Sequence, residues 1–220
     1  MKKIIFTLLL VFGHFVYSQT SKNFGDFSAV KVYDRINVNL VKSNNNEIQI
    51  KNDDPDVEIV NKNGELKIRM LPVKIMQGDK VYVTVFYKEI NEIQASQGSK
   101  ISVENTVKSK NLSIVSNEGS LLDIKVKAVV LKAKANSGGI INIAGKAESQ
   151  DLLVNSGAFY NGKDLESETA SVTANAGGEA DVFASKTLNA TTRAGGTITV
   201  YGSPEIKNVK NVLGGKVVFK

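Results

Sequence analysis

The sequence contains no cysteine, and its only histidine is His14. Without cysteine there is no disulfide framework, and no lipid can be attached through a cysteine at a signal cleavage site, so we do not expect a lipoprotein. His14 lies in an N-terminal segment that we expect to be removed, which leaves the exported chain without either residue. This excludes histidine acid–base catalysis, Ser-His-Asp triads, cysteine nucleophiles and the usual zinc sites.

Charge of one sign is also not concentrated anywhere in the chain. The formal net charge is +6, and it falls to +4 when Lys2 and Lys3 are removed with the N-terminal segment. The remaining charges are scattered, with no basic run interleaved with aromatic residues and no helix suited to a nucleic-acid groove. This pattern argues against nucleic acid as a partner.

The N-terminus predicts export. A short basic start is followed by an apolar run from Ile4 to Val16 and then by polar residues. The run is too short for a lasting transmembrane helix, so residues 1–18 are interpreted as a secretory signal peptide. Residues 19–26 are polar and are expected to form a loose leader. The expected location is the periplasm, the cell surface or the extracellular space.

Residues 27–90 alternate apolar and polar positions, with many β-branched residues, and this period of two predicts half-buried strands. Turn-forming residues such as Asn63-Gly64 separate the strands. No window presents a helical face, so helix content is expected to be close to nil. The pattern fits either an antiparallel cap or the first coils of the structure that follows.

Residues 91–220 repeat about every 19 residues. Aligned on a corner glycine, the repeats are separated by 21, 19, 19, 20, 18 and 19 residues. The corner glycines are Gly98, Gly119, Gly138, Gly157, Gly177, Gly195 and Gly214. Self-similarity at this period is typical of a solenoid, in which each repeat is one coil stacked on its neighbours.

Within each repeat, the positions three and five residues after the glycine are mostly apolar and are expected to point inward, as Ile141 and Ile143 do. The position between them is polar and is expected to point outward. The outward column is Ser102, Asp123, Asn142, Asn161, Asp181 and Thr199. Small residues before the corner predict a flattened coil. We therefore predict an all-β fold, a right-handed parallel β-helix or β-roll of about seven coils, sharing one core with residues 27–90.

Asparagine precedes the glycine by two residues in four successive repeats: Asn117, Asn136, Asn155 and Asn175. Stacked side-chain amides can form hydrogen bonds along the axis, and asparagine also tolerates left-handed backbone geometry. A row of amides that grips a sugar polymer is the alternative. The structural ladder is favoured because it needs no ligand, and it predicts largely buried, stacked side chains. The ladder should lapse at Arg193 and Val212.

Acidic residues in the outward column do not form a catalytic pair. Asp123 and Asp181 are three coils apart, which is about 14 Å at the spacing of neighbouring strands. Sugar-cleaving enzymes need two carboxylates about 5–9 Å apart. The Gly-Gly-x-Gly-x-Asp repeat of calcium-binding β-rolls is also missing. We therefore predict no catalytic residue, no cofactor and no metal site.

The candidate binding face is aromatic. Phe183 and Tyr201 occupy the same column in adjacent coils, beside Asp181, and Phe159 lies one coil earlier. Such a strip can stack on sugar faces or dock a partner. The alternative is that the rings only cover the edge of the coil, or that the neighbouring Tyr160 fills the core.

The C-terminal end carries Lys207, Lys210, Lys216 and Lys220. Lysines at the end of a solenoid can prevent unwanted strand pairing. Association of two protomers through this end is the competing prediction.

Several of these features together resemble the head GIN domain family of auto-transporter adhesins of Gram-negative bacteria. The similarity covers about residues 27–220. Its features are Phe27, Val30, Val32, Ile36, Val38 and Leu40, then Asn63-Gly64 with Leu66 and Ile68, then Ile90, Ile93 and Gly98 leading into glycine-rich coils. The usual glycine of the first turn is replaced by Tyr33-Asp34-Arg35.

The resemblance implies a secreted or envelope-associated β-helical domain and supplies no catalytic residues. The expected function is a non-enzymatic, adhesin-like binding module, with a protein or polysaccharide of the cell envelope as partner. A carbohydrate-binding or polysaccharide-cleaving β-helix is one alternative, and a scaffold that self-associates is another.

Overall fold

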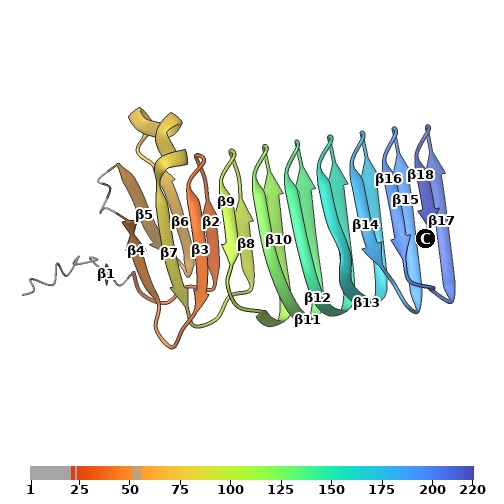
Figure 1. Cartoon of the computed structure of the whole chain (residues 1–220), viewed down its shortest axis with the longest axis horizontal. Helices are drawn as coiled ribbons and strands as arrows, with labels where there is room; N and C mark the ends of the chain where they lie inside the picture. Colours follow the sequence, from red (N-terminus) through yellow and green to blue (C-terminus); the bar gives the residue numbers. More distant parts are fainter. Residues whose placement is uncertain (1–20, 23, 52–53, 55) are drawn as a thin grey trace, which may run out of the picture.

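The computed structural model describes residues 21–22, 24–51, 54 and 56–220 as a nearly all-β solenoid. Its coils lie side by side in a row, with the N-terminal elements at one end and the C-terminus at the other (Figure 1). About seven turns and 66% strand confirm the predicted fold class. The predicted signal peptide, 1–18, lies outside the described residues.

Each coil places one strand in each of two parallel sheets, which we call layer A and layer B. Layer A contains, in spatial order, β6 (Glu65–Met70), β2 (Ala29–Val32), β8 (Glu92–Ala95), β10 (Val107–Asn117), the later parts of β11 (Leu121–Asn136), β12 (Ile140–Asn155) and β13 (Phe159–Asn175), β15 (Thr187–Arg193) and β17 (Ile206–Val212). Layer B contains β7 (Tyr82–Tyr87), β3 (Asn37–Lys42), β9 (Lys100–Val103), the first parts of β11, β12 and β13, β14 (Glu179–Phe183), β16 (Thr197–Tyr201) and β18 (Lys216–Phe219).

The N-terminal coils do not follow the order of the sequence. The coil of β2 and β3 lies between the coil of β6 and β7 and the coil of β8 and β9, because β2 pairs with β6 and β8 while β3 pairs with β7 and β9. The intervening β4 (Glu47–Ile50) and β5 (Val57–Lys62) pair antiparallel with β7 and β6. Residues 27–90 thus supply both coils and an antiparallel cap, on one core that continues through the solenoid.

Two expectations for this region are corrected. A nine-residue 3-10 helix, η2 (Pro72–Lys80), replaces the β6–β7 corner where no helix was expected. Pro72 at its start has the fixed φ that suits a first turn, and Gly78 lies so close to the Asp34 carbonyl that a Cβ would be 1.8 Å from its oxygen. The loose leader is also wrong for the described residues. β1 (Ser21–Lys22) pairs with β4, and the Asn61 amide donates to the Phe24 carbonyl at 2.7 Å.

The inward columns form the core as predicted, and Ile141 and Ile143 are buried. At the last coil the core becomes accessible, and Phe219 is 41% exposed. The Lys207 ammonium lies 4.8 Å from the centre of the Phe219 ring and covers it. Among the described residues, β17 and β18 have strand partners on one side only. Self-association through this end stays a prediction.

The core also contains a hydrogen-bond network that the sequence pattern did not indicate. Tyr160 is buried and donates to Gln150 Oε1 at 3.0 Å, while Gln150 Nε2 donates to Ser167 Oγ at 2.7 Å and to the Phe183 carbonyl at 2.9 Å. Burial raises the pKa of the Tyr160 phenol, so it keeps the proton that it donates. Tyr160 therefore fills the core, and its polar groups are satisfied there.

Candidate functional site

The corners of the solenoid are tight turns with two consecutive left-handed residues. At one corner Ser137 has φ +49° and Gly138 has φ +72°, and the Gly139 N–H donates to the Asn136 carbonyl at 2.9 Å. This is the geometry of a type I′ turn. The left-handed residues are therefore the glycine and the residue before it, and the asparagine stays extended. All seven predicted corner glycines, from Gly98 to Gly214, have positive φ.

The four corner asparagines form a ladder along the axis, which we call the corner ladder. Asn136 donates from Nδ2 to Asn117 Oδ1 at 2.8 Å, Asn155 to Asn136 at 3.0 Å, and Asn175 to Asn155 at 2.8 Å. The side chains are stacked as predicted, but they are half-buried and not largely buried as expected. Each inner rung is both donor and acceptor, so the ladder fixes the alignment of successive corners.

The corner ladder ends where Arg193 pairs with Asn175, and Asn175 Oδ1 is buried without a hydrogen-bond partner among the described residues. Replacing Arg193 by asparagine should add a rung whose amide donates to this oxygen. We expect a gain of about 1 kcal/mol in the free energy of unfolding, measured by urea denaturation. Arg193→Gln, which keeps an amide but places it one carbon farther away, is the control. An equal gain in both variants would contradict the ladder extension.

A second ladder lies on the outer surface of layer B, and we call it the groove ladder. It consists of Asp123, Asn142, Asn161 and Asp181 in successive coils. Asn142 Nδ2 donates to Asp123 Oδ1 at 2.5 Å, and Asn161 Nδ2 donates to Asn142 Oδ1 at 2.7 Å. Asp123 and Asn161 are exposed, so amide and carboxylate groups of this ladder remain open to a ligand.

The groove ladder forms the floor of a shallow groove of about 710 Å³. The groove runs along the axis from β9 to β16, and its other lining residues include Glu104, Lys125, Lys163, Asp164 and Tyr201. Its polar groups repeat at the coil spacing of about 4.8 Å. The groove therefore offers a linear array of hydrogen-bonding groups rather than one enclosed pocket.

The predicted aromatic residues lie on this same layer in different positions. Tyr201 lines the groove beside Asp181. Phe183 pairs with Tyr201 and is half-buried, because its ring packs over Gly202, where a Cβ would be 3.1 Å from two ring carbons. Phe159 is 39% exposed and occupies the column next to the corner, beside Ile140, outside the groove lining. Asp181, Phe183 and Tyr201 therefore lie close together on the paired strands β14 and β16, whereas Phe159 lies nearer the corner and outside the groove.

The two acids of the groove ladder are separated as the sequence indicated. The strand register places Asn142 and Asn161 between Asp123 and Asp181, which corresponds to three coil steps or about 14 Å. Among the described residues, no three His, Cys, Asp or Glu side chains are grouped closely enough to hold a metal ion. The groove can therefore offer hydrogen bonds and one aromatic face to a ligand.

The fold is shared with known proteins. The family model described as "Putative auto-transporter adhesin, head GIN domain" matches residues 26–204. The chain belongs to the head GIN domain family. This confirms the family resemblance that the sequence showed, and the match ends within the last two coils. No curated protein matches the sequence significantly.

Solved structures with the same fold come from Bacteroides and Parabacteroides species. A "putative adhesin" of Bacteroides fragilis NCTC 9343 has a TM-score of 0.83 and 18% identity, and the match covers 92% of this chain and 96% of that chain. A "putative adhesin" of Parabacteroides merdae ATCC 43184 has a TM-score of 0.71 and 19% identity, covering 92% and 95%. A "Putative lipid binding protein" of Parabacteroides distasonis ATCC 8503 has a TM-score of 0.71 and 15% identity, covering 92% and 96%.

In the part of the chain that the structure describes, no helix is long and apolar enough to cross a membrane.

Proposed function

We propose that this head GIN domain is a non-enzymatic binding module of the cell envelope, exported by its signal peptide, and that it holds a polysaccharide or an extended protein segment along the groove on layer B. The family and the adhesin descriptions of its structural relatives support an adhesin-like role. The groove ladder is the observation that carries the proposal.

The groove fits a linear ligand because its chemistry repeats along one direction. Four coils present an amide or a carboxylate at the same position, and only part of their hydrogen-bonding capacity is used within the ladder. Tyr201 provides an aromatic face at one end, where a sugar ring can stack. A neutral, hydroxyl-rich polymer matches these groups best. The four acids of the lining, Glu104, Asp123, Asp164 and Asp181, outnumber its two lysines and disfavour an anionic polymer.

The test combines a glycan array with an assay for new reducing ends. We expect retention of a neutral polysaccharide without cleavage. Phe183→Ala together with Tyr201→Ala should weaken binding by about tenfold or more. Leu153→Ala, on the outer surface of layer A, is the matched control and should leave binding unchanged. Release of reducing ends would overturn the non-enzymatic proposal. An equal loss of binding in Leu153→Ala would overturn the assignment of the binding face to the groove on layer B.

A further inference from the structure

A second concave site lies at the opposite side of the coils from the corners, where the order of the coils changes. The chain must pass from β7, in the outermost coil, to β8, two coils farther along, because β2 and β3 occupy the coil between them. The β7–β8 connection crosses this intervening coil, while the chain after β3 turns away to β4. A cavity lies between these diverging segments.

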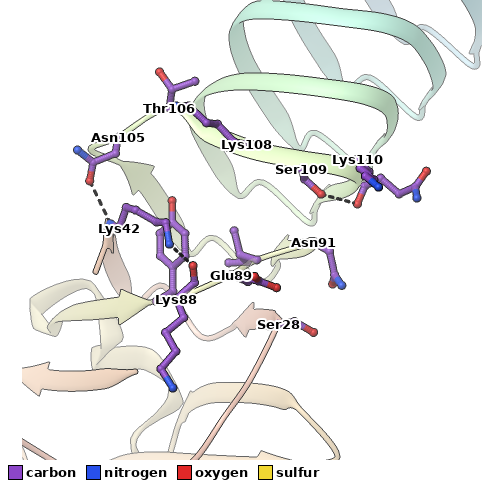
Figure 2. A pocket seen from close by; sticks show the side chains of 13 residues that line it. Ser28, Lys42, Lys88, Glu89, Asn91, Asn105, Thr106, Lys108, Ser109 and Lys110 are labelled. Carbon is purple, nitrogen blue, oxygen red and sulfur yellow. Dashed lines mark hydrogen bonds between the residues drawn. The ribbon is translucent and has the colours of Figure 1, made fainter. Parts of the chain in front are cut away.

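This crossover pocket has a volume of about 960 Å³. Its walls come from the end of β3, the β7–β8 connection, and the β9–β10 connection with the first residues of β10 (Figure 2). Asn105 Oδ1 accepts the Lys42 backbone N–H at 3.0 Å, and the Lys42 ammonium donates to the Lys88 carbonyl. These bonds join the three connections and hold Lys42 in place. The pocket is therefore a built feature of the fold.

The pocket is strongly cationic. It is lined by four lysines, Lys42, Lys88, Lys108 and Lys110, and by one acid, Glu89. The Lys88 ammonium pairs with Asp26 at 3.1 Å, and in Figure 2 its side chain runs away from Lys108 and Lys110. Neither Lys108 nor Lys110 takes part in an ion pair within the described residues. Their charges are therefore available to an anion.

A buried hydroxyl group in the wall provides an independent indication of a ligand. Tyr87 lines the pocket and is 2% exposed, and its hydroxyl is buried without a hydrogen-bond partner among the described residues. Burial raises the pKa of this phenol, so it remains a donor at neutral pH. A buried hydroxyl without a partner costs about 1–3 kcal/mol, and a polar ligand would remove this cost.

The neutral groups around the lysines indicate the kind of anion. Amide and hydroxyl side chains of Asn91, Asn105, Thr106 and Ser109 line the same cavity. Ser109 Oγ already donates to the Asn111 carbonyl at 2.9 Å and remains an acceptor, while the two amides and Thr106 can both donate and accept. Bare inorganic anions need donors only, whereas sugar hydroxyls need both. We propose that the crossover pocket binds an acidic sugar, a pyranose whose carboxylate pairs with Lys108 and Lys110 and whose hydroxyls bond to the amides and to Tyr87.

This site shares no lining residue with the groove and does not depend on the proposed function of the groove. The test is a two-dimensional NMR titration of the full exported chain. D-glucuronate, D-glucose and inorganic sulfate are added in separate titrations. We expect saturable shifts at Asn91, Asn105 and Lys108 with glucuronate, with dissociation constants about tenfold weaker for glucose and for sulfate.

Variants separate this site from general charge effects. Lys108→Glu with Lys110→Glu should abolish the glucuronate shifts, whereas Lys132→Glu with Lys134→Glu, an equal charge change on the outer surface of β11, should preserve them. Tyr87→Phe should keep the fold stable, since the Tyr87 hydroxyl has no hydrogen-bond partner among the described residues, and should weaken glucuronate binding several-fold. Equal affinity for sulfate, shifts that do not saturate, or equal loss in both charge variants would overturn the proposal. The groove variant Phe183→Ala with Tyr201→Ala should leave this titration unchanged. A failure of the proposed groove function can therefore be distinguished from a failure of the pocket proposal.

Discussion

Gly145→Ala is expected to lower the free energy of unfolding by about 4 kcal/mol. Gly145 lies where β12 bends from layer B to layer A, and its φ is +118°. A Cβ at this position would be 2.0 Å from the Val126 carbonyl oxygen of the neighbouring coil. Because the obstructing atom belongs to the backbone, two paired strands must separate to relieve the clash.

The control for this prediction is Gly157→Ala at a corner. Gly157 also has a positive φ, +65°, but a Cβ there would have no atom within 4 Å. Only backbone strain remains, so we expect Gly157→Ala to lower the free energy of unfolding by about 1–2 kcal/mol. Both variants are measured by urea unfolding followed by circular dichroism. Equal losses would mean that the coils are not packed as closely at the bend as the structure shows.

Asn136→Ala is expected to lower the free energy of unfolding by about 2 kcal/mol. Asn136 accepts a hydrogen bond from Asn155 and donates one to Asn117, so its removal leaves an amide and a carbonyl oxygen unpaired in a half-buried corner. A double-mutant cycle with Asn155→Ala should show coupling, because the second substitution removes a group that is already unpaired.

Asn161→Ala in the groove ladder is the matched comparison. Asn161 is exposed, and water can replace the bond that it donates to Asn142. We therefore expect a change of no more than about 0.5 kcal/mol. If Asn136→Ala lowered the free energy of unfolding as little as Asn161→Ala, this would contradict a structural role for the corner ladder.

The regular part of the molecule could be predicted from the sequence because each coil repeats the same short pattern of residues. The spacing from Gly98 to Gly214 gave the solenoid, and the column of Asn117, Asn136, Asn155 and Asn175 gave the corner ladder. These features depend on short-range patterns that recur in register. Periodicity alone therefore sufficed to place them.

The order of the N-terminal coils could not be predicted in the same way. Val30 pairs with both Leu66 and Ile93, and all three belong to similar alternating segments whose pairing partners the local pattern does not specify. The crossover pocket follows from this order, so its residues were missed as well. In the groove, the sequence placed Asn142 and Asn161 in the outward column but a second ladder was not predicted there, although asparagine in adjacent coils of one column was already a signal for it.

The central claim is that one asparagine ladder supports the fold and the other faces the ligand. The most direct test is to follow the side-chain amide signals of Asn142, Asn161, Asn136 and Asn155 by NMR while adding the neutral polysaccharide selected on the array. We expect the Asn142 and Asn161 signals to shift and saturate while those of Asn136 and Asn155 stay unchanged. Shifts confined to Asn136 and Asn155, or no shift at either ladder while the polysaccharide is bound, would contradict the claim.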